Sequence, residues 1–156
     1  VYWGDTTLGN IIFILKIIFM IQSIRLNEII VEYDKEKTSD AYINEINIKE
    51  DCPCGDCHFF VDVILKIDLE IFRFLKSVGT DLEKNLKNEP TGVWCIRDDD
   101  NDFVFFQQVY LIKGILSSNS SNHYEKEELG LKIDAEFINK DDNIIVDLKV
   151  GKVNLV

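Results

Sequence analysis

Proline and glycine are scarce in this chain, which has two and eight of them among 156 residues. Collagen-like and low-complexity disordered segments are rich in these residues, so both classes are excluded. Hydrophobic residues make up 46% of the sequence and aromatic residues 11%, which suffices for an ordinary globular core. A chain of this length holds one domain comfortably but not two, and we expect a single domain over residues 20–156.

Basic residues are also in short supply. Seventeen Lys and Arg stand against 28 Asp and Glu, which gives a formal net charge of −11 at pH 7. A field of this sign repels nucleic-acid phosphates and anionic membrane surfaces, and it favours basic partners or simple solubility. We therefore expect a small acidic binding module, such as an immunity or antitoxin-like inhibitor of a basic effector protein. Its acids should gather on one face, and neither nucleic acid nor membrane should be a partner.

No apolar run in the sequence has the length of a membrane span. The run Ile11 to Ile21 is interrupted by Lys16 and falls short of the roughly 20 residues that a bilayer requires. No basic segment precedes it and no small-residue cleavage site follows it, which argues against a signal peptide. The chain begins with Val1, and Met20 is its only methionine. We expect the native protein to start at Met20, with residues 1–19 as a non-native or loosely integrated extension; an ordinary N-terminal helix or edge element is the alternative.

The familiar catalytic motifs are missing as well. The sequence contains no nucleophile elbow, zinc-protease helix motif, P-loop or dinucleotide-binding glycine motif. The acidic run Asp98 to Asp102 lacks the Gly and the Glu that a calcium-binding EF-hand loop needs, so we interpret it as a solvated turn. Asp134, Asp147 and Lys149 loosely resemble the metal-binding set of restriction-like nucleases, but all three are expected on an outward, solvated face. We therefore expect no catalytic residues.

Alternation of apolar and polar residues predicts most of the secondary structure. The clearest case is a C-terminal hairpin, and the segment before residue 50 is expected to form a second hairpin across the charged turn 34–40. The expected strands are residues 24–33, 41–48, 93–96, 103–116, 129–137 and 144–150. The run Phe59 to Ile67 is ambiguous, because its apolar odd-numbered residues favour a strand while Phe60, Val63, Ile64 and Ile67 also fit a helix.

One central helix is predicted from Asp68, a good N-cap, to Val78, with Gly79 ending it. Its apolar stripe should place Ile71, Leu75 and Val78 on the inner face of the C-terminal hairpin. That inner face presents Leu131, Ile133, Val146 and Leu148. The expected fold class is α+β: an antiparallel sheet of about six strands with a central helical insert packed on one face.

The four cysteines are distributed unevenly. Three lie in the segment Cys52-Pro53-Cys54-Gly55-Asp56-Cys57-His58, and the fourth is Cys95. A disulfide framework would usually spread an even number of cysteines over a small secreted chain. The tight spacing suits reduced thiols or a metal better, and it indicates a cytosolic protein.

Several interpretations of this segment stay open. The spacing C-x-x-C-H is the attachment pattern of haem c, but the β-rich surroundings and the missing signal peptide disfavour haem. Cys54 and Cys57 match the first half of a tetrahedral zinc site, and Cys52, His58 and above all Cys95 are candidates to complete it, although a second ligand pair is missing. Thiol redox chemistry normally places such a pair at a helix N-terminus in a βαβ fold, unlike the fold expected here. Small cysteines lining a tight turn are the purely structural alternative.

Four short motifs in the middle of the chain occur together. They are Cys54-x-x-Cys57-x-x-Phe60, Phe74-Leu75-x-x-x-Gly79-x-Asp81-x-x-Lys84, Val93-Trp94-Cys95 and Tyr110-x-Ile112-x-Gly114. Over residues 54–114 the chain thereby resembles a set of small uncharacterised bacterial proteins. The resemblance implies a cytosolic bacterial domain and carries no activity with it. Pro53 and His58 are not features of that set.

Overall fold

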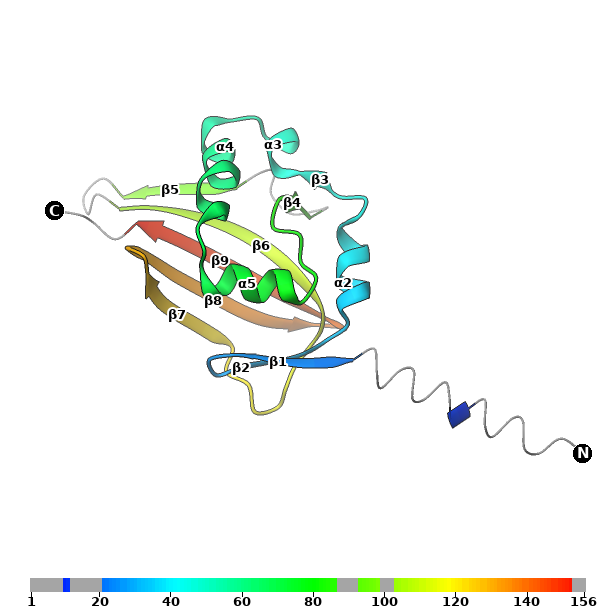
Figure 1. The fold of residues 1–156 in the computed structure, drawn as a ribbon. Coiled ribbons are helices and arrows are strands. Elements are labelled where there is room, and N and C mark those ends of the chain that lie inside the picture. Colours follow the sequence, from blue (N-terminus) through cyan, green and yellow to red (C-terminus); the bar gives the residue numbers. More distant parts are fainter. Residues whose placement is uncertain (1–9, 12–20, 87–92, 99–102, 153–156) are drawn as a thin grey trace, which may run out of the picture.

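A computed structural model of the chain describes residues 10–11, 21–86, 93–98 and 103–152. Its main element is a seven-stranded antiparallel sheet in the order β1-β2-β6-β9-β8-β7, with β5 paired to β6 beside this path (Figure 1). β6 is long enough to pair with β5 near its start and with β2 near its end. The strands are β1 (Gln22–Leu26), β2 (Ile29–Tyr33), β5 (Trp94–Asp98), β6 (Phe103–Leu116), β7 (His123–Glu128), β8 (Leu131–Lys140) and β9 (Asn143–Lys152).

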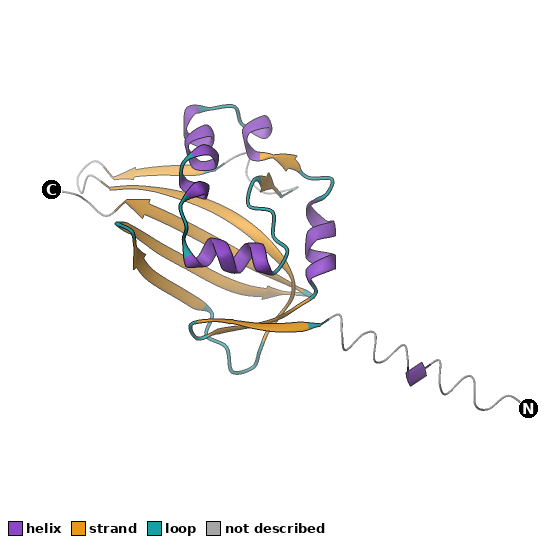
Figure 2. Cartoon of the chain, viewed as in Figure 1, coloured by secondary structure: helices purple, strands orange, loops and turns teal. Residues whose placement is uncertain are grey.

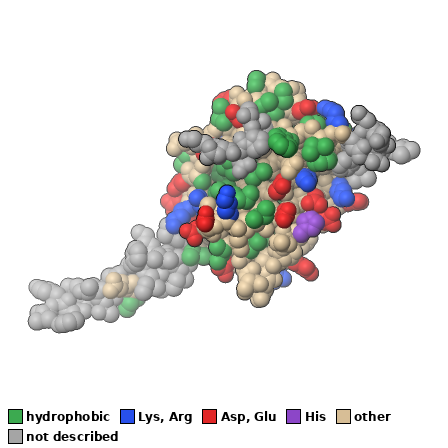
Figure 3. All heavy atoms as spheres, turned by 180° about the vertical axis from the view of Figure 1, so that it is seen from behind, with side chains coloured by type: hydrophobic (Ala, Val, Ile, Leu, Met, Phe, Trp, Pro, Cys, Tyr) green, Lys and Arg blue, Asp and Glu red, His purple; other side chains and the backbone are tan. Residues whose placement is uncertain are grey.

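Helices cover one face of this sheet (Figure 2). The helical layer contains α2 (Lys35–Tyr42), α3 (Ile48–Asp51), α4 (Gly55–Asp62), the 3-10 turn η1 (Ile64–Lys66) and α5 (Glu70–Ser77), with the short paired strands β3 (Ile46–Asn47) and β4 (Lys84–Asn85) beside it. The opposite face carries interspersed hydrophobic and charged side chains (Figure 3). The α+β class is confirmed, with several short helices in place of one insert. None of the described helices is long and apolar enough to cross a membrane.

The C-terminal hairpin has the predicted alternation. β8 and β9 pair in a register that sets Ile133 opposite Val150 and Ala135 opposite Leu148. Successive side chains of a strand point to opposite faces, so one set of residues in each strand meets the helices. The buried set is Leu131, Ile133, Ala135 and Phe137 from β8, and Ile144, Val146, Leu148 and Val150 from β9. These eight residues form the floor of the hydrophobic core.

The predicted central helix is α5, and its C-terminal end matches the prediction. Ile71, Leu75 and Val78 are all fully buried, and the Phe74 ring lies edge-on to Phe137 of β8 at 6.1 Å between centroids. Gly79 has φ = 99°, and its N–H together with that of the next residue closes the last turn onto carbonyls inside the helix. A left-handed glycine in this position is the usual way to end a helix.

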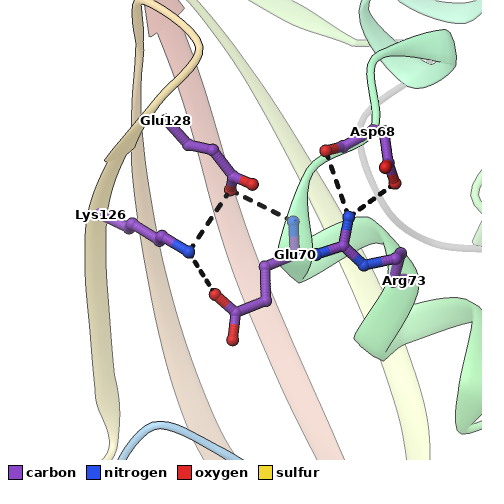
Figure 4. A network of polar contacts seen from close by, with 5 residues as sticks. All are labelled: Asp68, Glu70, Arg73, Lys126 and Glu128. Carbon is purple, nitrogen blue, oxygen red and sulfur yellow. Dashed lines mark hydrogen bonds and ion pairs between the residues drawn. The ribbon is translucent and has the colours of Figure 1, made fainter.

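The N-terminal end of α5 differs from the prediction, because Leu69 and not Asp68 is the N-cap residue and offers no side-chain acceptor. Asp68 instead accepts hydrogen bonds from Arg73 Nη1 through its side chain (2.6 Å) and its carbonyl (3.3 Å). The N–H of Glu70 donates to Glu128 of β7 at 3.2 Å. Lys126, also on β7, pairs with both Glu70 and Glu128 (Figure 4). An acceptor from the sheet thus serves the helix start that no local side chain caps.

The strand predicted at residues 41–48 is wrong for most of its length: only Ile46 and Asn47 form a strand, β3, and it pairs with β4 instead of closing the predicted hairpin. The charged segment before it forms α2, with Asp34 as N-cap accepting from the N–H of Lys37 at 3.0 Å. Tyr42 ends this helix, and its hydroxyl donates to the carbonyl of Leu111 while accepting from the N–H of the same residue. The alternation at 41–48 is therefore overridden by a cap and by a tertiary contact to β6. The hairpin partner of β2 is β1, joined through Asn27 at φ = 50°.

The strand favoured for Phe59 to Ile67 is also wrong, and the helical alternative is the one observed. Residues 55–62 form α4, in which Cys57, Phe60 and Val61 are buried at helical spacing. Ring contacts of Phe59 and Phe60 with Phe106, at 5.7 and 5.9 Å between centroids, seat α4 on β6. Apolar residues on more than one side of the helix produced the apparent period of two.

Two expectations fall on parts of the chain outside the described residues. Of the acidic turn predicted from Asp98 to Asp102, Asp98 is the last residue of β5, and residues 99–102 are not described. Of the N-terminal extension, residues 10–11 alone are described. The strand β7 was not predicted, because its sequence HYEKEE buries only Tyr124 and lacks an apolar alternation.

The packing of α5 predicts a large difference between its buried face and the outer face of the sheet. Leu75→Ala should lower the free energy of unfolding by about 2–5 kcal/mol, since it removes apolar contacts and leaves a cavity. Glu136→Ala, on the exposed face of β8, should change it by less than about 0.5 kcal/mol. Urea unfolding of both variants measures this, and equal losses would show that the sheet faces the other way.

Candidate thiol and metal site

The segment that carries three of the cysteines links α3 to α4. Cys52 is the C-cap of α3, and its N–H donates to the carbonyl of Ile48 at 2.9 Å. Cys54 has an extended conformation and is the N-cap of α4, while Cys57 lies in the first turn of that helix. Two helix ends therefore meet within six residues and bring the three side chains toward one another.

The three Sγ atoms of Cys52, Cys54 and Cys57 lie within 4.8 Å of one another, and we call this group the thiol cluster. A zinc ion bound to sulfur at about 2.3 Å in a tetrahedron sets its sulfurs about 3.8 Å apart, so a small inward movement is enough to bind it. Burial is graded across the cluster: Cys57 is fully buried, Cys52 half-buried and Cys54 exposed. An ion in this cluster would have protein on one side and solvent access on the other.

Backbone amides point at two of the sulfurs. The N–H of Cys57 donates to Cys54 Sγ at 3.4 Å, as expected at a helix N-cap, and the N–H of Val93 donates to Cys57 Sγ at 3.3 Å. Donors of this kind favour the thiolate over the thiol. The contact from the N–H of Cys57, supported by the neighbouring thiols, lowers the pKa of Cys54. Burial raises the pKa of Cys57 despite the donor from Val93.

The other two candidate ligands lie outside the thiol cluster. Cys95 is on β5, half-buried against the core and close to the Asp56 carboxylate, and burial raises the pKa of its thiol. His58 is half exposed, with its Nδ1 3.7 Å from a carboxylate oxygen of Asp62. An ion pair of 2.9 Å between Asp56 and Arg97, which was not predicted from the sequence, connects α4 to β5 beside the thiol cluster.

The acids of the nuclease-like set lie on the outer face of the sheet. Asp134 is the cross-strand partner of Lys149, while Asp147 accepts a hydrogen bond from Gln107 at 2.8 Å. His123 Nε2 lies 3.1 Å from Asp134 Oδ1, with Glu125 nearby. This is an exposed side-chain contact on the outer face, and the acid that lies with it is Glu125; neither Asp147 nor Lys149 belongs to the group.

The chain was also compared with known proteins. No protein-family model matches it, and no match was found among the curated proteins or among the solved structures.

The electrostatics of the thiol cluster predict an order of reactivity toward iodoacetamide. Cys54 should react first and at a lower pH than an ordinary cysteine, because its lowered pKa leaves more thiolate near neutrality and its side chain is exposed. Cys57 should react last, because it is buried and its pKa is raised. Mass spectrometry of metal-free, reduced protein across pH 6–10 measures the four rates. In denaturant the four cysteines should react alike, and a native protein that reacts alike at all four would contradict the predicted order.

Proposed function

We propose that the protein is a zinc-binding module in which Cys52, Cys54 and Cys57 hold one ion through their thiolates. The observation that carries this proposal is the convergence of the three Sγ atoms within 4.8 Å. Zinc is the metal most often bound by cysteine clusters of this kind, and soft thiolate ligands select it over the hard cations magnesium and calcium. The net charge of −11 also raises the local concentration of cations.

The protein environment supports binding of a cation at the thiol cluster. Cys54 is already biased toward its thiolate, so that ligand is prepared for the metal. Burial of Cys57 disfavours a lone negative charge, and a bound cation would remove that penalty. The amide of Val93 already points at Cys57 Sγ and would stay there as an outer contact of the bound thiolate.

The proposed site has three protein ligands and leaves a fourth position to water or another molecule. His58 contacts Asp62. Cys95, on the neighbouring strand β5, lies beside Asp56 of α4. The three ligands span only residues 52–57, so the ion closes a very short loop and removes little conformational freedom from the unfolded chain. A site of this type contributes modestly to the stability of the whole fold and suits reversible metal binding.

Thiol–disulfide exchange is a second candidate function, favoured by the asymmetry of Cys54 and Cys57. Cys54 is exposed at the N-terminus of α4 with a lowered pKa, and Cys57 is buried one turn into the same helix. In such a pair the outer thiolate attacks a disulfide substrate and releases one thiol; the inner cysteine then displaces the second thiol and closes the intramolecular disulfide. The helix N-terminus that this chemistry normally uses is present, although the fold is not βαβ.

The acidic inhibitor expected from net charge stays a prediction. It requires acids gathered on one face and an association rate that falls as salt rises. The outer face of the described sheet carries acids and lysines together, including the Asp134 and Lys149 pair, so it offers no single-sign field.

Zinc content tests the main proposal directly. Reduced protein purified without added metal should bind one zinc ion per chain, because three cysteine sulfurs converge on one position. Cys52→Ser, Cys54→Ser and Cys57→Ser should each lower the affinity for zinc at least about tenfold. Cys95→Ser and His58→Ala are the matched controls and should bind zinc like the wild type. Metal analysis and competition with a chromophoric chelator measure these values.

The outcomes separate the two candidate functions. Zinc binding that survives loss of Cys54 but not of Cys95 would overturn the proposed ligand set. Failure to bind zinc, together with reduction of a small disulfide substrate that requires Cys54 and Cys57 but not Cys52, would support thiol–disulfide exchange in its place.

A further inference from the structure

We propose that a groove between α4 and the neighbouring end of the sheet binds an amphipathic molecule with one aliphatic chain and one anionic head group, of the fatty-acid class. This inference does not depend on the zinc proposal, since the groove and the thiol segment share only Asp56. Three observations carry it: the shape and lining of the groove, a strained hydrophobic residue at its edge, and the charges along its floor.

The groove exists because the strands extend past the helical layer. At the strand ends on the left of Figure 1, the inner-face residues Arg97, Val104, Lys152 and Leu131 follow one another across β5, β6, β9 and β8. Phe106 and Val150 form the next row of the floor. The helical side contributes Phe59 of α4 and its C-cap residue Val63, then Ile64 and Ile67. The groove is open to solvent, and its volume of about 630 Å³ lies within the range of sites for small molecules.

Large hydrophobic side chains remain exposed around this groove. Phe59 is 47% exposed, Val63 43% and Leu129 72%. Scattered exposed hydrophobic residues need no explanation, but several that converge on one concave, mostly apolar surface indicate a binding site. Burial of these side chains against an aliphatic chain would remove the apolar surface that the free protein exposes.

Leu129 is the most unusual of these residues. It forms, with Gly130, the two-residue turn between β7 and β8, and both have positive φ, 53° and 75°. This turn type strongly prefers Asn followed by Gly, because bulky residues are strained at positive φ. The other two non-glycine residues with positive φ in the described part of the chain are Asn27 and Asp141, which tolerate it. A strained, exposed leucine at the edge of an apolar groove indicates a functional constraint.

The charges select the head group. The chain has a net charge of −11. The outermost row of the groove floor nevertheless contains two basic residues, Arg97 on β5 and Lys152 on β9. Among the described residues that line the groove, Asp56 is the one acid, and it is paired with Arg97 at 2.9 Å. Lys152 is exposed and has no ion pair with another described residue. Within the described lining, Lys152 is therefore the cation that can meet an anionic group.

The floor also argues for an aliphatic occupant over a peptide strand. β6, β9 and β8 each have a paired strand on both sides at this end of the sheet. An extended peptide gains most of its affinity by adding to a free strand edge, and these three strands offer none. Among the described strands, β5 pairs with β6 alone, so an unpaired edge lies at the margin of the floor and not along it. Within the groove, recognition therefore depends on apolar side chains and on Lys152.

Three ten-carbon probes that differ only in the head group test the proposal: decanoate, decanol and decyltrimethylammonium. Titrations followed by amide chemical shifts of the full chain, below the micelle concentration of each probe, give the site and the dissociation constant. Decanoate should bind most tightly and shift residues of α4, the β7–β8 turn and the end of β9. The net charge of the chain favours the cationic probe everywhere else, so this order reports on the groove.

Variants separate the chain-binding and head-group contributions. Lys152→Gln should weaken decanoate about tenfold and leave decanol unchanged, while Lys132→Gln on the outer face should change neither. Val63→Asp should abolish binding of all three probes, and Ile43→Asp, at a site 65% exposed on the far end of α2, should not. Leu129→Asn should weaken decanoate at least fivefold and raise the urea midpoint of unfolding, because it relieves strain.

The results that overturn the proposal are specific. They are equal affinity for the three probes, tighter binding of the cation, shifts elsewhere in the chain, or decanoate binding that survives Val63→Asp. A Leu129→Asn protein that is more stable and binds decanoate as before would remove the argument from strain and, with it, the assigned site.

Discussion

The one-sided burial of the sheet is the constraint on which the other features depend. β6, β8 and β9 each turn a mainly apolar row toward the helices, interrupted in β6 by the buried Gln108, so the helical layer has to supply apolar surface along most of their length. Three aromatic contacts position it: Phe74 on Phe137 for α5, and Phe59 and Phe60 on Phe106 for α4. Because the strands run to 14 residues while these helices have eight, the layer cannot cover the whole sheet. The groove and the thiol segment both lie at the margin of this coverage.

Polar contacts hold the remaining helices in place without leaving their buried groups unpaired. Tyr110 is fully buried, its hydroxyl donates to the carbonyl of Leu82 at 2.8 Å, and burial raises its pKa. Gln108 donates to Asn85, which in turn donates to Asp51 at the end of α3. A buried amide without such partners costs more free energy than the hydrogen bond returns, so these contacts fix register as well as position. α3 is thereby tied to β6, and α3 delivers Cys52 to the thiol cluster.

Sequence patterns predicted the sheet better than the helices, for a physical reason. A strand that is buried on one face must alternate, so β8, β9 and β6 were recognisable from their residues alone. Whether a short segment becomes a helix depends on caps and tertiary contacts, and Tyr42 shows this: its hydroxyl bonds β6 and places the alternating segment around it in α2. The polar strand β7 could not be predicted from an apolar alternation. It is held by pairing with β8 and by contacts of Lys126 and Glu128 with Glu70 of α5.

The sequence predicted a site made of cysteines, but it could not predict which of the four cysteines come together. The spacing of Cys52, Cys54 and Cys57 suggested a metal or redox site, whereas proximity to Cys95 could be judged only once α4 was placed. The decisive fact was that residues 55–62 are helical, since this makes Cys54 an N-cap and turns its sulfur toward the other two.

The error over Phe59 to Ile67 and the proposed ligand groove have one origin. A helix that faces only a core shows a single apolar stripe, and Cys57, Phe60, Val61 and Ile64 form that stripe in α4 and the turn after it. Phe59 and Val63 form a second apolar stripe that lines the groove, beside Asp56. Together the two stripes fill most positions of residues 59–67 and mimic a buried strand. Phe59 packs on Phe106 with one side of its ring, yet Phe59 is 47% exposed and Val63 43%, so packing on the sheet uses only part of their apolar surface. The hydrophobic residues found there are the feature that misled the periodicity, and they are accounted for if that side of α4 is covered by a ligand.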